Sequence, residues 1–95
     1  MKTAEAEKRR LRGLAHALKP CVHVGNAGVT DAVVLELGIA LDHHELLKVK
    51  IRAADRDQRE VALTKLLERS GAQLVSRIGN IAVLYRKNPA KPATE

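Results

Sequence analysis

The sequence predicts a single α/β (α+β) domain whose elements follow in the order helix, strand, helix, strand, helix, strand, strand. Its 95 residues suit one domain. Segments with helical periodicity alternate with short segments of strand periodicity, and the last two strands are separated only by Gly79-Asn80, a tight hairpin. Two strand-helix-strand units favour parallel crossovers, and the hairpin adds an antiparallel strand. We therefore expect a mixed four-stranded sheet with helices packed on it.

The first helix is predicted from Ala4 to Leu18, before Pro20, which cannot continue a helix. Its apolar positions recur at i, i+3, i+4 and i+7, as Leu11, Leu14, Ala15 and Leu18. Basic side chains lie away from this apolar stripe or at its border, and we expect them to contact a polyanion: Lys8, Arg9, Arg12, His16 and Lys19.

A short alternating strand, residues 21–24, leads into the loop Gly25-Asn26-Ala27-Gly28 and then into a second helix. Thr30 is a good N-cap for that helix, Asp31 complements its dipole, and its apolar face continues to about residue 44. The following strand alternates apolar residues with Lys48, Lys50 and Arg52. The pattern predicts a half-buried strand with a basic outer face, on which Lys48 and Lys50 are candidate RNA contacts that would extend the basic surface of the first helix. An ordinary solvated strand face is the simpler alternative.

A third helix is predicted between an Asp55 cap and Gly71, with Val61, Ala62, Leu63, Leu66 and Leu67 on its apolar face. Two strands, residues 74–78 and 81–86, close the domain. We assign residues 1–87 to the domain and residues 88–95 to a disordered basic tail rich in Pro, Ala and Lys.

Composition narrows the class of protein. The net charge is +6, and the basic excess lies in residues 1–20 and 71–95, while the middle of the chain is nearly neutral. Basic ends on a neutral body suit a polyanion such as RNA. No apolar run approaches the ~20 residues of a membrane helix, and the charged N-terminus does not resemble a secretory leader. With one cysteine, the expected compartment is the cytoplasm.

The glycine loop is the candidate binding site. Without β-carbons, Gly25 and Gly28 let the main chain turn sharply and approach a ligand, and the amide groups of the following helix favour an anion. A phosphodiester backbone fits this description, as in the GXXG loop of KH domains. A plain tight turn would need no function, but the adjacent basic helix favours RNA. Because Tyr85 is the only aromatic residue, recognition should be by backbone and shape.

Catalytic and metal sites are not expected. Cys21 and His23 lie two apart on a strand, but no third group is evident to orient a nucleophile. The four histidines do not recur at metal-ligand spacing, and one cysteine cannot build a structural zinc site alone. We therefore predict no enzyme activity, no metal, no cofactor and no small-molecule substrate.

Several runs of residues closely resemble the YhbY family, the stand-alone bacterial form of the CRM domain, named for chloroplast RNA splicing and ribosome maturation. They are Leu18-Lys19-Pro20, Gly25-Asn26-Ala27-Gly28-Val29-Thr30, the Ala40-Leu41 pair with the run 44–50, and the Gly79 hairpin with Leu84-Tyr85-Arg86. The resemblance covers about residues 8–87. It implies a fold similar to the C-terminal domain of translation initiation factor three and an RNA-contacting loop at residues 25–28. Many family members place a basic residue in this loop, whereas Asn26 and Ala27 are neutral.

Two hypotheses of function follow. In the first, the protein is a monomer that binds ribosomal RNA in large-subunit precursors and assists ribosome assembly, using the glycine loop and the basic helix. In the second, it is an adaptor that docks on a ribosomal protein, and its basic ends only keep it near the ribosome. Strong salt sensitivity of binding to naked RNA would distinguish the first from the second.

Overall fold

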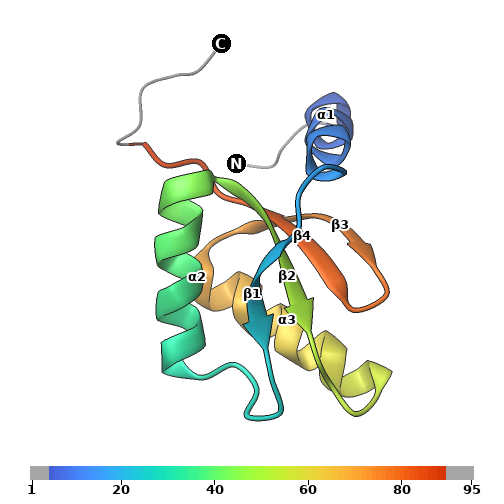
Figure 1. Ribbon diagram of the computed structural model, residues 1–95, viewed down its shortest axis with the longest axis vertical. Coiled ribbons are helices and arrows are strands. Elements are labelled where there is room, and N and C mark those ends of the chain that lie inside the picture. Colours follow the sequence, from blue (N-terminus) through green and yellow to red (C-terminus); the bar gives the residue numbers. More distant parts are fainter. Residues whose placement is uncertain (1–4, 90–95) are drawn as a thin grey trace.

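The computed structural model describes residues 5–89 and confirms the predicted order of elements. The elements are α1 (Glu5–Ala15), β1 (Pro20–Val24), α2 (Asp31–His44), β2 (Leu46–Ile51), α3 (Arg56–Ser70), β3 (Gln73–Ile78) and β4 (Ile81–Tyr85). They build a four-stranded sheet with the strand order β1-β2-β4-β3 (Figure 1). β1 and β2 pair in parallel, while β4 lies antiparallel between β2 and β3. The predicted mixed sheet is therefore confirmed.

Helices α2 and α3 cover one face of the sheet, and their ends are fixed by the caps that the sequence predicts. Thr30 Oγ1 accepts a hydrogen bond from Val33 N at 3.1 Å, and Asp55 Oδ1 accepts one from Gln58 N at 2.8 Å. Gly71 ends α3 in the left-handed conformation, with φ at 73°. The main core lies between these helices and the sheet, and it includes Val22, Val24, Leu37, Leu41, Leu47, Val49, Ile51, Leu63, Leu66 and Leu84.

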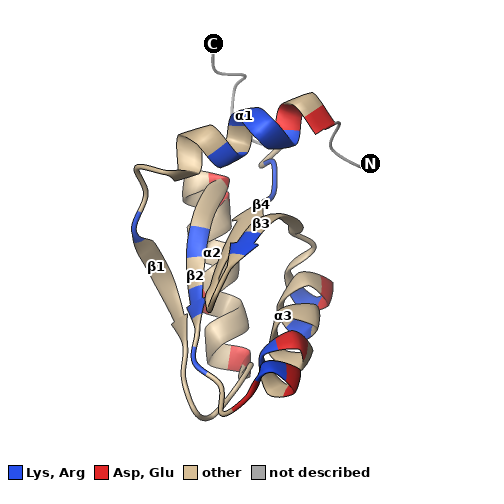
Figure 2. Ribbon diagram, turned by 90° about the vertical axis from the view of Figure 1, so that its right-hand side faces the viewer, with Lys and Arg blue, Asp and Glu red and all other residues tan. Residues whose placement is uncertain are grey.

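Helix α1 packs on the opposite face of the sheet, across one end (Figures 1 and 2). Its buried residues, Leu11 and Ala15, form a second small core with Val75 and Val83. Val83 alternates with the main-core residues of β4, so it must point to the other face. The sheet is thus covered on both faces at one end, while the other end of the α1 face is left without a helix.

Two predicted details are wrong. Helix α1 ends at Ala15 and not at Leu18, and the chain continues in turns in which Leu18 N donates to Ala15 O at 3.0 Å. Leu14 and Leu18 are 54% and 37% exposed, because the second core reaches no further than Ala15. Similarly, Val61 is 54% exposed, because α3 faces the sheet with Leu63 and Leu66 instead.

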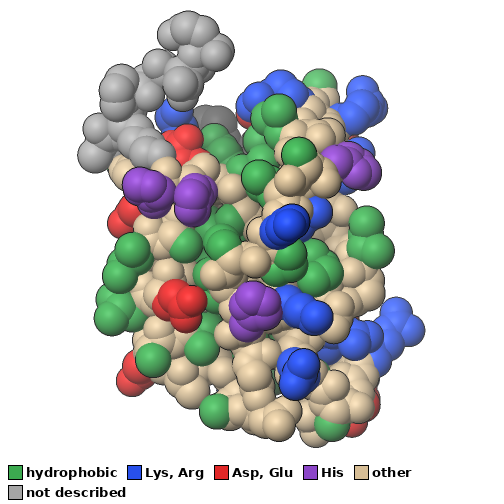
Figure 3. Space-filling view, viewed as in Figure 1, with side chains coloured by type: hydrophobic (Ala, Val, Ile, Leu, Met, Phe, Trp, Pro, Cys, Tyr) green, Lys and Arg blue, Asp and Glu red, His purple; other side chains and the backbone are tan. Residues whose placement is uncertain are grey.

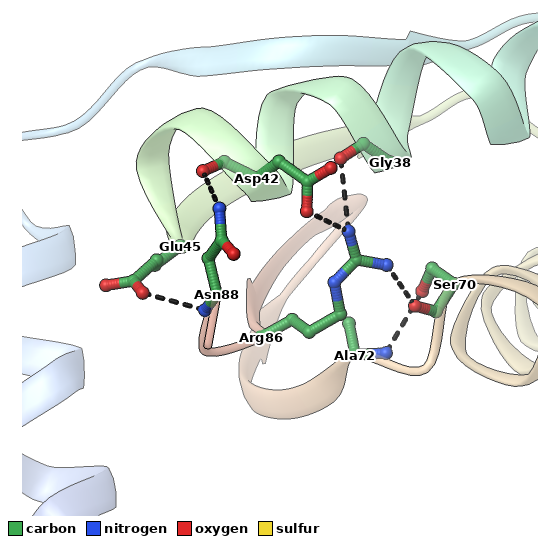
Figure 4. A network of polar contacts seen from close by, with 7 residues as sticks. All are labelled: Gly38, Asp42, Glu45, Ser70, Ala72, Arg86 and Asn88. Carbon is green, nitrogen blue, oxygen red and sulfur yellow. Dashed lines mark hydrogen bonds and ion pairs between the residues drawn. The ribbon is translucent and has the colours of Figure 1, made fainter. Parts of the chain in front are cut away.

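Polar contacts fasten the chain after β4 to α2 and to the end of α3 (Figure 4). The Arg86 guanidinium donates to Ser70 O, Gly38 O and Asp42 Oδ1 at 2.5, 3.1 and 2.9 Å. Asn88 N donates to a carboxylate oxygen of Glu45 at 2.8 Å. Asn88, which we assigned to the tail, is thus held against α2, while residues 90–95 of the expected disordered tail lie outside the described residues.

Candidate nucleic-acid interface

The glycine loop joins β1 to α2 as a tight turn. Gly28 N donates to Gly25 O at 3.0 Å, and Thr30 N donates to Gly28 O at 3.1 Å. Gly28 has a φ of 79°, which only glycine adopts without strain. The φ of Gly25 is not positive, and a Cβ built there has no atom within 4 Å. The fold therefore requires glycine at position 28 but not at position 25.

Gly25, Asn26 and Ala27 are exposed, and the loop borders a hollow of about 410 Å³. His23 and Lys50 face one another in the register of β1 and β2, and both side chains lie at this hollow. We call it the loop hollow, and its lining residues are His23, Val24, Gly25, Asn26, Lys50 and Arg52. The neutral loop is thereby placed next to two cations of another segment.

A second, smaller hollow of about 130 Å³ lies between α1 and the sheet. Lys48, Val83 and Ser76 face one another across β2, β4 and β3, and all three line it. We call it the helix hollow, and its lining residues are Arg12, Ala15, His16, Lys48, Ser76, Ile78 and Val83. Because Lys48 and Lys50 are two apart on β2, they point to the same side of the sheet. The two hollows therefore open on the same side of the molecule.

The cations at the two hollows take part in none of the ion pairs found within residues 5–89. Those pairs are Arg10–Glu7, Arg69–Asp31, Arg77–Glu60 and Arg86–Asp42. The paired arginines lower the pKa of Glu7 and of Glu60, chiefly through hydrogen bonds to the carboxylates. In Figure 3, blue Lys and Arg side chains gather on the right-hand side of the view, with His side chains among them. The positive charge of this side is available to an external anion.

The structure brings some of the predicted site residues together and leaves others apart. Arg12, His16 and Lys48 meet at the helix hollow, although His16 lies just beyond the end of α1. Lys50 meets Gly25 and Asn26 at the loop hollow, and Gly28 closes the turn behind them. Four other residues that we expected to contact RNA line neither hollow: Lys8, Arg9, Lys19 and Ala27.

Sequence reasoning did not assign His23 to the site and named Arg52 only as part of the basic face of the second predicted strand, yet both line the loop hollow. The signal was present in the alternation of β1 and β2, which places His23 and Lys50 on the outward face. The sequence could not show that the two strands are neighbours, and so that these side chains meet. Ile78, on β3, was missed as well; it is 76% exposed at the rim of the helix hollow.

The surroundings of Cys21 do not favour the reactive thiolate. Cys21 and His23 are both exposed on β1, but partial burial raises the pKa of the Cys21 thiol, which disfavours the thiolate. Within residues 5–89, no three His, Cys, Asp or Glu side chains are grouped so that they could hold a metal ion. No helix in the same range is long and apolar enough to cross a membrane.

Comparisons with known proteins agree on one family. The chain is 42% identical over 89 residues to the probable RNA-binding protein PA4753 of Pseudomonas aeruginosa, covering 94% of this chain and 86% of that protein. It is 44% identical over 80 residues to an RNA-binding protein of Haemophilus influenzae, covering 84% and 81%. The solution structure of SAV1595 from Staphylococcus aureus superposes with a TM-score of 0.81 at 28% identity, covering 98% of this chain and 95% of that one. The CRS1 / YhbY (CRM) domain matches residues 4–86, and the chain therefore belongs to the CRM domain family.

Proposed function

We propose that this protein binds RNA through the side of the molecule that carries the loop hollow and the helix hollow. The observation that carries the proposal is that cations of α1, β2 and the segment after β2 lie beside the glycine loop and form no ion pair within residues 5–89. Cations without acidic partners gain free energy by replacing the counterions of a phosphate backbone. The names of the relatives as RNA-binding proteins support the same partner.

The glycine loop contributes to binding by letting the RNA come close to the main chain, and it adds no charge of its own. Asn26 and Ala27 are neutral, so the attraction comes from Lys50 and Arg52 beside the loop and from the main chain of the exposed residues 25–27. The open space around Gly25 lets a phosphate reach the main chain. The remaining basic residues of the N-terminal segment extend the positive field toward the same ligand, namely Lys8, Arg9 and Lys19.

The RNA we propose is ribosomal RNA in precursors of the large subunit, bound in the cytoplasm during assembly of the subunit. The family resemblance in the glycine loop and in the run 44–50 supports this choice. The proposed role is binding without catalysis and without a metal or cofactor. The raised pKa of the Cys21 thiol supports it, because it disfavours the thiolate beside His23. The proposed acting species is a monomer.

The first test removes two cations of the sheet and measures the salt dependence of RNA binding. In Lys48→Gln with Lys50→Gln, fluorescence anisotropy should show weaker binding to single-stranded RNA. The slope of log affinity against log salt should be smaller by about 1.4, because each phosphate contact to a single strand contributes roughly 0.7. The matched control, Arg56→Gln with Lys65→Gln, removes two exposed cations of α3 and should leave both quantities unchanged. Equal losses in the two variants would show a nonspecific charge effect.

The second test identifies the RNA. Ultraviolet crosslinking of the tagged protein in growing cells, followed by sequencing, should give a sharp peak in large-subunit ribosomal RNA. Crosslinked peptides should come from residues 8–28 or from β2. Scattered RNA sequences would contradict the ribosomal assignment, even if the purified protein binds RNA.

A second candidate function, docking on a ribosomal protein, is favoured by one observation. Leu35 and Ile39 lie one turn apart on α2 and are 66% and 63% exposed. Paired exposed apolar side chains are typical of a protein contact. If this candidate is correct, Leu35→Ser with Ile39→Ser should abolish association with precursor particles while leaving the affinity for naked RNA unchanged.

A further inference from the structure

The helix hollow combines an apolar floor with a basic rim. Ala15 and Val83 are 2% and 7% exposed and form part of the floor, where α1 meets the sheet. Arg12 and His16 approach from α1 and the turn that follows it, and Lys48 approaches from β2. An anion alone would need only the rim, while an apolar ligand alone would not suit three basic side chains. A ligand with a flat apolar part joined to negative charge would use both.

Ile78 strengthens this interpretation. It is the most exposed large apolar side chain among the described residues, at 76%, and it stands at the edge of the same hollow. Its register partner on β4 is Ile81, which in turn faces Lys50 on β2. Two apolar side chains of β3 and β4 thus lie next to a basic side chain of β2 on the open part of the sheet. An exposed β-branched residue beside cations gives a nucleobase a surface to lie on, while the phosphates on either side contact the cations.

Two side chains of the rim are themselves planar. Bases in single-stranded RNA stack on imidazole rings and on guanidinium planes as well as on Phe, Tyr and Trp. His16 supplies an imidazole plane for the base, while the Arg12 guanidinium is left to contact phosphate, and neither has an ion-pair partner within residues 5–89. The shortage of aromatic residues therefore does not restrict this protein to contacts with the RNA backbone.

A different hollow, of about 270 Å³, lies between the glycine loop and α3 and is also apolar. Its lining includes Asp57 and Lys65, so its charges nearly cancel, and Asp57 would repel a phosphate. The helix hollow, in contrast, joins an apolar floor to a rim of one sign. The hollow between the glycine loop and α3 therefore does not suit a nucleotide, whereas the helix hollow offers both an apolar surface and positive charge.

We infer that the helix hollow is a subsite for one unstacked nucleobase of single-stranded RNA, with Ile78 and His16 against the base and with Arg12 and Lys48 on the adjoining phosphates. This inference rests on the proposed RNA-binding function and adds to it a contact to a base. Because a base in a duplex is stacked on its neighbours, the subsite selects single-stranded segments, loops or bulges. The glycine loop then holds backbone elsewhere on the same strand.

The test compares two probes of equal charge: a single-stranded RNA of about twelve nucleotides, within the usual size of single-strand sites, and a ribose-phosphate chain of the same length without bases. Anisotropy titrations at one salt concentration give the two affinities. The protein should bind the RNA roughly tenfold more tightly, since contact with one base has about that effect. Ile78→Ser should lower the RNA affinity toward that of the abasic chain and leave the abasic affinity unchanged. His16→Ala, tested separately, should lower the RNA affinity by a larger factor than the abasic affinity.

The matched control is Leu35→Ser, which shortens another exposed apolar side chain, on α2, and should change neither affinity. Circular dichroism should be unchanged in all three variants, because the substituted side chains are exposed. Equal, salt-sensitive affinities for the two probes would overturn the subsite and leave the proposed function standing. A preference for RNA that survives both Ile78→Ser and His16→Ala would place the base elsewhere and also overturn it. Failure to bind either probe would refute the proposed function, and the subsite with it.

Discussion

The two glycines of the loop should respond to substitution in different ways. Gly28 has a φ of 79°, and an alanine there must adopt the left-handed conformation, at a cost of about 1–2 kcal/mol. For a domain of this size, each 1 kcal/mol lowers the melting temperature by roughly 4–8 °C. Gly28→Ala should therefore melt about 5–15 °C lower than the unchanged protein.

Gly25→Ala should leave stability unchanged. Position 25 has no positive φ, and the added Cβ finds no atom within 4 Å, so the free energy of unfolding should move by no more than about 0.5 kcal/mol. RNA affinity should nevertheless fall roughly tenfold, because the new methyl group occupies the approach to the main chain and one charge-assisted hydrogen bond is lost. Gly25→Asp should lose about a further tenfold, since its carboxylate repels the phosphate.

Urea unfolding followed by circular dichroism measures the first quantity, and anisotropy titration with single-stranded RNA measures the second. Gly38→Ala, in the middle of α2, is the matched control: it should stabilise the helix by about 0.5–1 kcal/mol and leave RNA affinity unchanged. If Gly25→Ala and Gly25→Asp bind RNA as tightly as the unchanged protein, no ligand approaches the loop and the reasoning from its open space is refuted. Unchanged stability in Gly28→Ala would refute the assignment of strain to that residue.

Three further predictions concern the fold. Arg86→Ala should reduce the free energy of unfolding by about 2–3 kcal/mol in urea titrations, because three acceptors on α2 and α3 lose a charged donor; an unchanged midpoint would contradict this. Leu11→Ala should detach α1 while the sheet stays folded, and amide exchange should then become fast in residues 5–15 but not in β2 or β4. Because Arg77 lowers the pKa of Glu60 from 4.5, the pair stabilises the fold above the unfolded value and loses this contribution as the pH falls through the folded one. Glu60→Gln should therefore weaken the loss of stability between pH 5 and 3 in acid titrations, and an identical acid profile would count against the pair.

Local signals in the sequence were enough for most of the fold. The caps at Thr30, Asp55 and Gly71 act within one turn of their helices, so a few adjacent residues determine them. The end of α1 could not be found in this way. Leu14 and Leu18 continue the helical spacing, but whether they are buried depends on how far the sheet extends beneath them.

The candidate site was only partly predictable for a related reason. The alternation of β2 shows that Lys48 and Lys50 point the same way, but not which face of the sheet they share with α1. Lys48 and Lys50 share a face with α1 because α1 packs on the face opposite α2 and α3, where its side chains Leu11 and Ala15 are buried. The spacing of residues in the sequence shows only which neighbours along the chain share a face. The helix hollow, in contrast, is lined by residues up to about seventy positions apart.

The position of β4 has a consequence for the order in which the chain folds during synthesis. The last strand to leave the ribosome is an inner strand of the sheet, and it supplies the hydrogen-bonding partners of both β2 and β3. Until Ile81–Tyr85 emerges, the nascent chain has no means of joining β3 to the β1-β2 pair, and both strands keep open edges. The apolar side chains of β4 must also arrive before either core can close, since Leu84 belongs to one and Val83 to the other. Folding of this domain is therefore completed after translation has passed β4, and a nascent chain stalled earlier would present unpaired strands to its neighbours.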